Sequence, residues 1–297
     1  MKSILCFCVL SLMTAVTALA APDLLAAYVD GSVYLQSGSA WKELSIGDSV
    51  PATATIRLDT GASLKLSGMG ATISLRQKGS YDLRAVLSAR QTLGSADVAA
   101  AIAGKMRLLL DGSSTDQNSV AGVRGANESK SDESGWVESG TQDAIQEAMG
   151  SIEAEKYGEA IIKLSSAEDE ATAENLPELH YYLAFAYSQN GDADNANKEL
   201  DDIRTPGGVS WAGDYILLKA KLELDNLAFS QELAWLSQTG NDLSGDGMRA
   251  PLYYFLLGIG YRGIGDVPSE KASFSKVIAI SADSDLGKSA AQLLTNL

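Results

Sequence analysis

The stretch from Pro177 to Ile203 reads PELHYYLAFAYSQNGDADNANKELDDI, and its pattern decides the fold of the second half of the chain. Apolar residues recur there every three to four positions, the spacing that lines one face of a helix. Gly191 and Asp192 interrupt the pattern, and a second run with helical spacing follows them. We therefore expect two helices that pack together as a hairpin.

The same layout returns further along the chain, between Pro251 and Phe274. Pro251 and Gly265 are equivalent to Pro177 and Gly191 at a single offset (251 − 177 = 265 − 191 = 74). This offset corresponds to about two units of a repeat of roughly 34 residues. One hairpin cannot bury its own apolar face, so stacked copies supply the core. Further helical segments are expected from Gln142, in degenerate form between Ser210 and Thr239, and over residues 286–297.

The first half of the chain has a different pattern, in which apolar and polar residues alternate between about Leu24 and Val86. Glycine-rich turn signals separate the alternating runs, which favours an antiparallel sandwich or a barrel-like sheet. Trp41 and Leu44 fit either the core or the surface of this sheet, and the core is the default expectation. Ser95 is a suitable cap for a helix that reaches Leu110. The predicted strands cover residues 33–35, 55–58, 63–66 and 73–75.

Four motifs give this half a family resemblance: Gly31-Ser32-Val33, Leu44 with Gly47-Asp48, Thr60 with Ala62 and Leu64, and Val120-Ala121-Gly122-Val123-Arg124-Gly125. Together they resemble a FecR-type domain over roughly residues 30–126. The resemblance implies an exported β domain, which in iron-transport regulators is the periplasmic part that relays a receptor signal to a sigma factor. Those regulators carry a cytoplasmic segment and a transmembrane helix ahead of the domain, and the sequence shows neither. Arg124 could bind an anion, but a structural role between two glycines is favoured.

The helical half resembles tetratricopeptide repeats, through Tyr157-Gly158-Glu159-Ala160-Ile161 and through the pattern around Leu183-Ala184, Tyr187 and Gly191. Small residues in these patterns let paired helices approach closely. The resemblance implies an α-helical solenoid, so the fold class is α+β with several domains. The expected boundaries are a signal peptide at 1–20, a FecR-like β domain at 21–126 with a helical insertion near 95–110, a linker at 127–141 and a TPR-like domain at 142–297.

Export is expected from the first twenty residues. Lys2 precedes an apolar run that ends Ala18-Leu19-Ala20, the three-part pattern of a secretory signal peptide. Both cysteines, Cys6 and Cys8, lie inside this run, too early for a lipid-modified cysteine at the cleavage site. We expect a soluble periplasmic or secreted protein without disulfides and without stable membrane insertion after cleavage.

The charge balance bears on the class of partner. The chain has 23 Lys+Arg and 38 Asp+Glu, a net charge of −15, which becomes −16 (−15 − 1) without Lys2. Nucleic acid and anionic lipid are repelled on average by such a surface. The expected partner is another envelope protein or a peptide, and not nucleic acid.

Several motifs resemble chemical sites. Gly258-Ile259-Gly260-Tyr261-Arg262-Gly263 matches a dinucleotide fingerprint, but it falls inside an expected helix and not after a strand. Asp192-Ala193-Asp194-Asn195 lacks the glycine and the glutamate of a calcium loop, and Glu168-Asp169-Glu170 suits a solvated edge between helices. His180, the only histidine, is expected to be structural and partly buried. We therefore expect no catalytic residue, no metal and no cofactor.

The favoured function is a non-catalytic binding or scaffolding module of the cell envelope. A periplasmic signal-sensing component related to FecR-type regulators is the alternative. An envelope hydrolase is a weaker one, because the spacing of the many Asp and Glu residues does not identify two that would act together as a catalytic pair. Residues on the first helix of each hairpin that avoid the seam are candidates for a partner-binding groove, with packing between repeats as the alternative for the aromatic ones. These candidates are Glu178, Tyr181, Phe185, Ser188, Gln189, Phe255 and Arg262.

Overall fold

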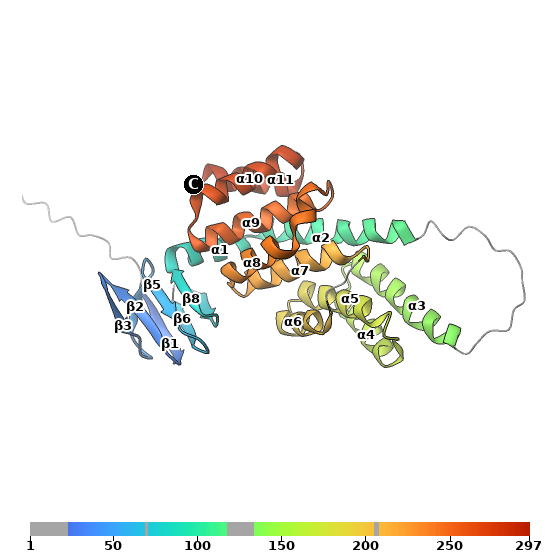
Figure 1. Ribbon diagram of the computed structural model, residues 1–297, viewed down its shortest axis with the longest axis horizontal. Helices are drawn as coiled ribbons and strands as arrows, with labels where there is room; N and C mark the ends of the chain where they lie inside the picture. Colours follow the sequence, from blue (N-terminus) through green and yellow to red (C-terminus); the bar gives the residue numbers. More distant parts are fainter. Residues whose placement is uncertain (1–22, 69–70, 118–133, 205–207) are drawn as a thin grey trace, which may run out of the picture.

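The computed structural model describes residues 23–68, 71–117, 134–204 and 208–297. An antiparallel β region comes first and a helical part follows it (Figure 1). The expected signal peptide and the Val120–Gly125 motif with Arg124 lie outside the described residues. No helix among the described residues is both long enough and apolar enough to cross a membrane.

The β region consists of two four-stranded antiparallel sheets with strand orders β4-β1-β6-β7 and β3-β2-β5-β8. Alternate residues of both sheets point into a shared apolar core, as the period of two requires. Leu44 lies in this core as expected, whereas Trp41 on the edge strand β3 is 38% exposed, so its expected burial is wrong. The strands are β1 (Asp23–Asp30), β2 (Val33–Ser37), β3 (Ala40–Glu43), β4 (Ser49–Pro51), β5 (Thr55–Leu58), β6 (Ser63–Gly68), β7 (Ala71–Leu75) and β8 (Gly79–Asp82).

Two helices follow the last strand directly. The alternating pattern was expected to continue to Val86, but α1 (Leu83–Leu93) begins immediately after Asp82, whose carboxylate accepts hydrogen bonds from the Arg84 and Ala85 amides. The helix expected near residues 95–110 is present as α2 (Ala96–Gln117). α1 packs mainly against α9, and α2 packs against α7 and α11. Both helices therefore belong to the helical core, and α2 is not an insertion into the β region.

Four antiparallel helical hairpins and a last helix follow within the described part of the chain. The helices begin within two residues of the starts expected from the sequence, except that the first hairpin begins at Ser134 and not at Gln142. The segment 134–141, expected to be linker, is therefore helical, and Thr141 is fully buried. The hairpins are α3 (Ser134–Glu153) with α4 (Tyr157–Ala167), α5 (Leu176–Gln189) with α6 (Ala193–Asp202), α7 (Ala212–Asp225) with α8 (Phe229–Thr239) and α9 (Ala250–Ile264) with α10 (Val267–Ser281); α11 (Asp285–Thr295) ends the chain, and the 3-10 helices η2 (Glu168–Glu170) and η3 (Asn241–Gly245) follow α4 and α8.

The four hairpins turn in the same way. One residue with positive φ sits at each turn: Glu155 (58°), Gly191 (82°), Leu227 (59°) and Gly265 (78°). The amide of the next residue then donates to the carbonyl five positions back, at 2.8–2.9 Å in all four turns, which satisfies an orphan carbonyl of the first helix. The turns are 36, 36 and 38 residues apart (191 − 155, 227 − 191, 265 − 227), slightly longer than the roughly 34 residues expected from the sequence.

Candidate functional site: a polar cleft between the sheets and the helices

A cleft of about 710 Å³ separates β7 and the end of α1 from helices α6 and α7. Its walls come from parts of the chain more than a hundred residues apart, and its lining is mostly polar. The lining residues are Thr72, Ser74, Arg76, Gln77, Arg90, Leu93, Gly94, Asp194, Asn197, Asp201, Lys219, Glu223, Asp225, Asn226 and Leu227.

The sheet-side wall of the cleft is cationic. Arg76 follows β7 and is exposed, and Arg90 lies in the last turn of α1. The Arg90 guanidinium donates to the backbone carbonyl of Thr72, so α1 fixes the strand that carries this wall. Neither arginine forms an ion pair with a carboxylate that the structure describes, and no carboxylate lines this side. The wall therefore presents two uncompensated guanidinium groups.

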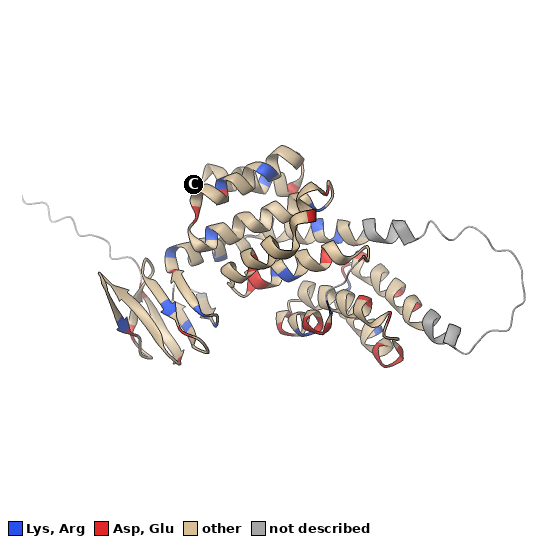
Figure 2. Cartoon of the chain, in the orientation of Figure 1, with Lys and Arg blue, Asp and Glu red and all other residues tan. Residues whose placement is uncertain are grey.

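The helical wall is acidic. Figure 2 marks the Asp and Glu positions of α6 in red on the ribbon. Asp194, Asn197 and Asp201 are three to four positions apart and line one face of α6. On α7, Lys219 is 3.5 Å from Asp201 and lies over the Trp235 ring at 5.0 Å, so it is held in place. Glu223 is half-buried one turn further on, and burial raises the pKa of its carboxyl group. Four lining carboxylates against one lining ammonium leave this wall negative.

A side-chain hydrogen bond near α8 links the two parts of the molecule beside the cleft. Gln231 of α8 donates to the side-chain oxygen of Gln77 at 3.4 Å. A smaller cavity of about 340 Å³ continues from the other end, sharing Leu93 and Asp225 with the cleft. Its floor is the small-residue face of α2, formed by Ala99, Ala100 and Ala103.

Two of the groove residues expected from the sequence reach this second cavity. Ser188 and Gln189, at the end of α5, line it together with Lys221. The Lys221 ammonium donates to Ser188 Oγ at 3.1 Å and pairs with Asp225 at 2.6 Å. Ser188 is nevertheless only 8% exposed, so its side chain belongs to the wall and not to an open surface.

The aromatic groove candidates are core residues, and their expected exposure is wrong. Tyr181 stacks on Trp211 with ring centroids 5.2 Å apart, and Phe185 is completely buried. Phe255 is also completely buried and packs against Phe274 of α10 at 5.5 Å. The alternative interpretation, that these rings pack between helices, is the one that the structure supports.

The charged groove candidates are both at least partly buried. Glu178 is half-buried, and burial raises the pKa of its carboxyl group. Arg262 is 8% exposed and donates to Glu270 Oε1 of α10 at 2.6 Å and to Thr92 Oγ1 of α1 at 2.7 Å. It was expected to point outward, but α1 covers the α9 surface on which it lies. The groove expected on the first helices is therefore occupied in part by the chain's own α1 and α2.

The motifs that resembled chemical sites have structural roles. The three glycines of the 258–263 motif lie inside α9, where added Cβ atoms would collide with Phe274, Glu232 and Phe229. The Asp192 carboxylate caps α6 by accepting from the Asn195 amide at 3.2 Å. Residues Glu168–Glu170 are exposed in a short 3-10 helix, as expected.

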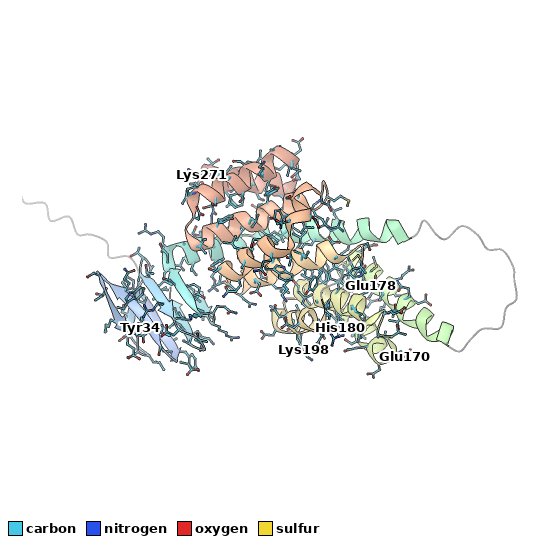
Figure 3. All side chains as sticks on the ribbon, viewed as in Figure 1. Tyr34, Glu170, Glu178, His180, Lys198 and Lys271 are labelled. Atoms are coloured by element: carbon cyan, nitrogen blue, oxygen red, sulfur yellow. The ribbon has the colours of Figure 1, made fainter. Side chains whose placement is uncertain are left out.

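His180 lies on α5, away from the strands (Figure 3). It is 6% exposed, and its Nδ1 is 2.5 Å from Glu199 Oε2 of α6, a hydrogen bond that raises the pKa of the imidazole. The burial of His180 that was expected from the sequence is confirmed. The only imidazole of the chain is thus directed at a carboxylate within its own hairpin.

Sequence reasoning did not find the cleft itself. The polar stripe of Asp194, Asn197 and Asp201 was visible in the sequence, but such a stripe is typical of any solvated helix face. Nothing in it indicated that β7 lies opposite. Comparisons of the chain with models of known protein families, with curated proteins and with solved structures found no match.

Proposed function

We propose that this protein is a non-catalytic binding or scaffolding module of the cell envelope, with a FecR-like β region followed by a TPR-like helical repeat. The observation that carries the proposal is the charged cleft between the two parts, with guanidinium groups on one wall and carboxylates on the other. Opposite walls of opposite sign suit a protein segment that itself carries both signs, because each side then meets a complementary potential.

The repeated hairpin turn supports the scaffolding part of the proposal. Four hairpins with the same turn geometry build one continuous apolar core, and the inner helices are further fixed by α1 and α2. A framework of this kind fixes the position of the two cleft walls relative to each other. Less conformational entropy is then lost when a partner binds. The internal pairing of His180 with Glu199 also fits a role in binding, because that imidazole is not presented to a substrate.

Export to the periplasm or the exterior belongs to the same proposal. It is supported by the Lys2 start, the apolar run and the Ala18-Leu19-Ala20 ending of the first twenty residues. N-terminal sequencing of the protein from its native cells is expected to begin at or near Ala21. A mature chain that still starts at Met1 would refute this part and would leave the binding proposal standing.

Site-specific photo-crosslinking tests the binding function. A photoreactive amino acid at Asn197, inside the cleft, is expected to capture a discrete partner in cells that express the full chain. The same amino acid at Ser166, exposed on α4 and outside the lining, serves as the matched control. Capture at both positions alike, or at neither, would count against the cleft as the binding site.

A further inference from the structure

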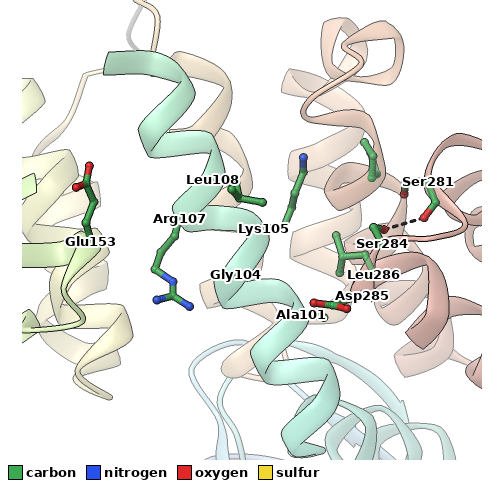
Figure 4. A pocket seen from close by; sticks show the side chains of 11 residues that line it. Ala101, Gly104, Lys105, Arg107, Leu108, Glu153, Ser281, Ser284, Asp285 and Leu286 are labelled. Atoms are coloured by element: carbon green, nitrogen blue, oxygen red, sulfur yellow. Dashed lines mark hydrogen bonds between the residues drawn. The ribbon is translucent and has the colours of Figure 1, made fainter. Parts of the chain in front are cut away.

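A third cavity lies on the other side of the helical part, between α2, the start of α9 and the α10–α11 junction (Figure 4). Its volume is about 570 Å³, within the roughly 300–1,000 Å³ that is typical of small-molecule sites. It shares no lining residue with the cleft described above. A ligand in this cavity would therefore bind independently of a partner in the cleft.

One face of α2 forms the floor of this cavity. Ala101, Gly104, Lys105 and Leu108 follow the spacing i, i+3, i+4 and i+7, which places them on one side of the helix. Pro251 and Leu286 provide apolar walls from α9 and α11, and both are buried. Leu108 is 61% exposed, so an apolar side chain stands at the open rim.

Gly104 is the feature that packing does not explain. It lies in the interior of α2, where glycine is less favourable than alanine. A Cβ placed on it would meet no atom within 4 Å, whereas a Cβ on the glycines of α9 would collide with Phe274, Glu232 or Phe229. The absence of a side chain at this position leaves room in the cavity.

Lys105 is the cation of the cavity. It extends from the side of α2 that carries Leu108, whereas Arg107 extends from the opposite side toward α3 (Figure 4). The Lys105 side chain forms no ion pair with the residues that the structure describes, and its half-buried position lowers the pKa of its ammonium group. The nearby carboxylates of Asp214 and Asp246 are already bound by Arg249 at 2.8 and 3.0 Å.

The other charged lining groups are compensated or lie apart from Lys105. Arg107 pairs with Glu155, and Asp285 lies 3.7 Å from Lys288. Glu153 is exposed on α3, on the Arg107 side of the helix. The lining thus combines apolar side chains with one ammonium group that forms no ion pair among the described residues, which suits a molecule with an apolar body and one negative charge.

We propose that this cavity binds a small amphiphile with a single carboxylate head group. The carboxylate would bind Lys105 Nζ, and the alkyl chain of the ligand would lie between Leu108, Pro251 and Leu286. The uncharged floor at Gly104 admits the first methylene groups, and a charge-assisted hydrogen bond to the ammonium fixes the head group. Burial of the ligand's alkyl chain provides the favourable free energy of binding, because it removes apolar surface from water.

Isothermal titration of the full mature chain with decanoate, below the concentration at which it forms micelles, tests the proposal. Decanol and decyltrimethylammonium are the neutral and cationic comparisons. Saturable one-site binding is expected for decanoate, weaker binding for decanol and none for the cation. Absence of saturable decanoate binding, or equal binding of all three, would overturn the proposal.

Two pairs of variants place the site. Gly104→Leu fills the cavity and is expected to weaken decanoate binding at least about tenfold, whereas Gly158→Leu on α4, where a side chain also meets open space, should leave it unchanged. Lys105→Met should weaken decanoate about tenfold and leave decanol unchanged, and Lys105→Arg should retain decanoate binding. Circular dichroism confirms that each variant folds. Equal binding by Gly104→Leu and wild type would show that the amphiphile binds elsewhere.

Discussion

Arg262 Nη1 of α9 donates to Thr92 Oγ1 of α1 at 2.7 Å, across 170 residues of sequence. The same guanidinium binds Glu270 of α10 through Nε at 2.6 Å, and all three side chains are buried. The helix that follows the last strand is thereby joined to the last hairpin. α1 also carries Arg90, which donates to the Thr72 carbonyl on the sheet-side wall of the cleft, so that wall is connected through α1 to the last hairpin.

Arg262→Ala is expected to lower the free energy of unfolding by about 3–5 kcal/mol, because it leaves the Glu270 carboxylate buried without its cation. Thr92→Val removes one neutral partner of the same guanidinium and should cost about 1 kcal/mol. Urea unfolding followed by circular dichroism measures both. The double variant Arg262→Met with Glu270→Met removes both charges and should recover much of the loss. If Arg262→Ala costs no more than Thr92→Val, the buried pair does not contribute as described.

Gly263→Ala is expected to destabilise the protein, although alanine favours helix formation by about 1 kcal/mol. The added methyl group would overlap the Phe229 ring of α8, and overpacking of this kind costs about 1–3 kcal/mol. Gly158→Ala, in α4 with open space around the Cβ position, should instead stabilise by up to about 1 kcal/mol. Melting temperatures of the two variants are expected to move in opposite directions. Shifts in the same direction would contradict the close approach of α8 and α9.

Phe185→Ala is expected to cost about 3–5 kcal/mol, since its ring is completely buried. Tyr187→Ala, on the same helix but half-buried, serves as a comparison and should cost less. Thermal unfolding separates the two. A stable Phe185→Ala variant would restore the interpretation of this ring as an exposed groove residue.

Glu232 of α8 is completely buried, and neither of its carboxylate oxygens has a hydrogen-bond partner among the described residues. Burial raises the pKa of this carboxyl group well above its ordinary value, with the charge of Glu223 as a further contribution. Its folded-state pKa exceeds its unfolded one, so its stabilising contribution is complete below the ordinary glutamate pKa. That contribution is lost as the pH rises through the folded-state pKa.

Glu232→Gln is therefore expected to be more stable relative to wild type as the pH rises. The unfolding free energy of both proteins between pH 5 and pH 9 measures this difference. His180 also has a raised pKa and loses stabilisation in the same direction, but its contribution is common to both proteins and cancels in the difference. A difference that does not change with pH would show that Glu232 is not buried as an uncharged acid.

The helical half was predictable from sequence because its signals are local. Gly191 and Gly265 each mark a hairpin turn, and Asp192 and Asp266 each cap the second helix, so the offset of 74 residues carries over directly to the structure. The start of α1 was missed, because alternating residues before it favour a strand and the only counter-signal was the cap at Asp82.

The site could not be predicted in the same way. Phe185 and Phe255 share the helical spacing of exposed positions, but neighbouring helices bury both, and a pattern along one helix cannot show what covers it. Arg262 was assigned to the surface for the same reason. The cleft places Arg76 opposite Asp194 and Glu223, which lie more than a hundred residues further along the chain, and only the tertiary arrangement creates this relationship.

The most direct test of the cleft as the binding site is hydrogen–deuterium exchange of the full chain with and without the partner captured at Asn197. Binding is expected to slow exchange in segments 72–77, 90–94, 194–201 and 219–227, which line the cleft, and to leave α4 and α10 unchanged. Slower exchange on α4 or α10, with the four cleft segments unaffected, would contradict the account.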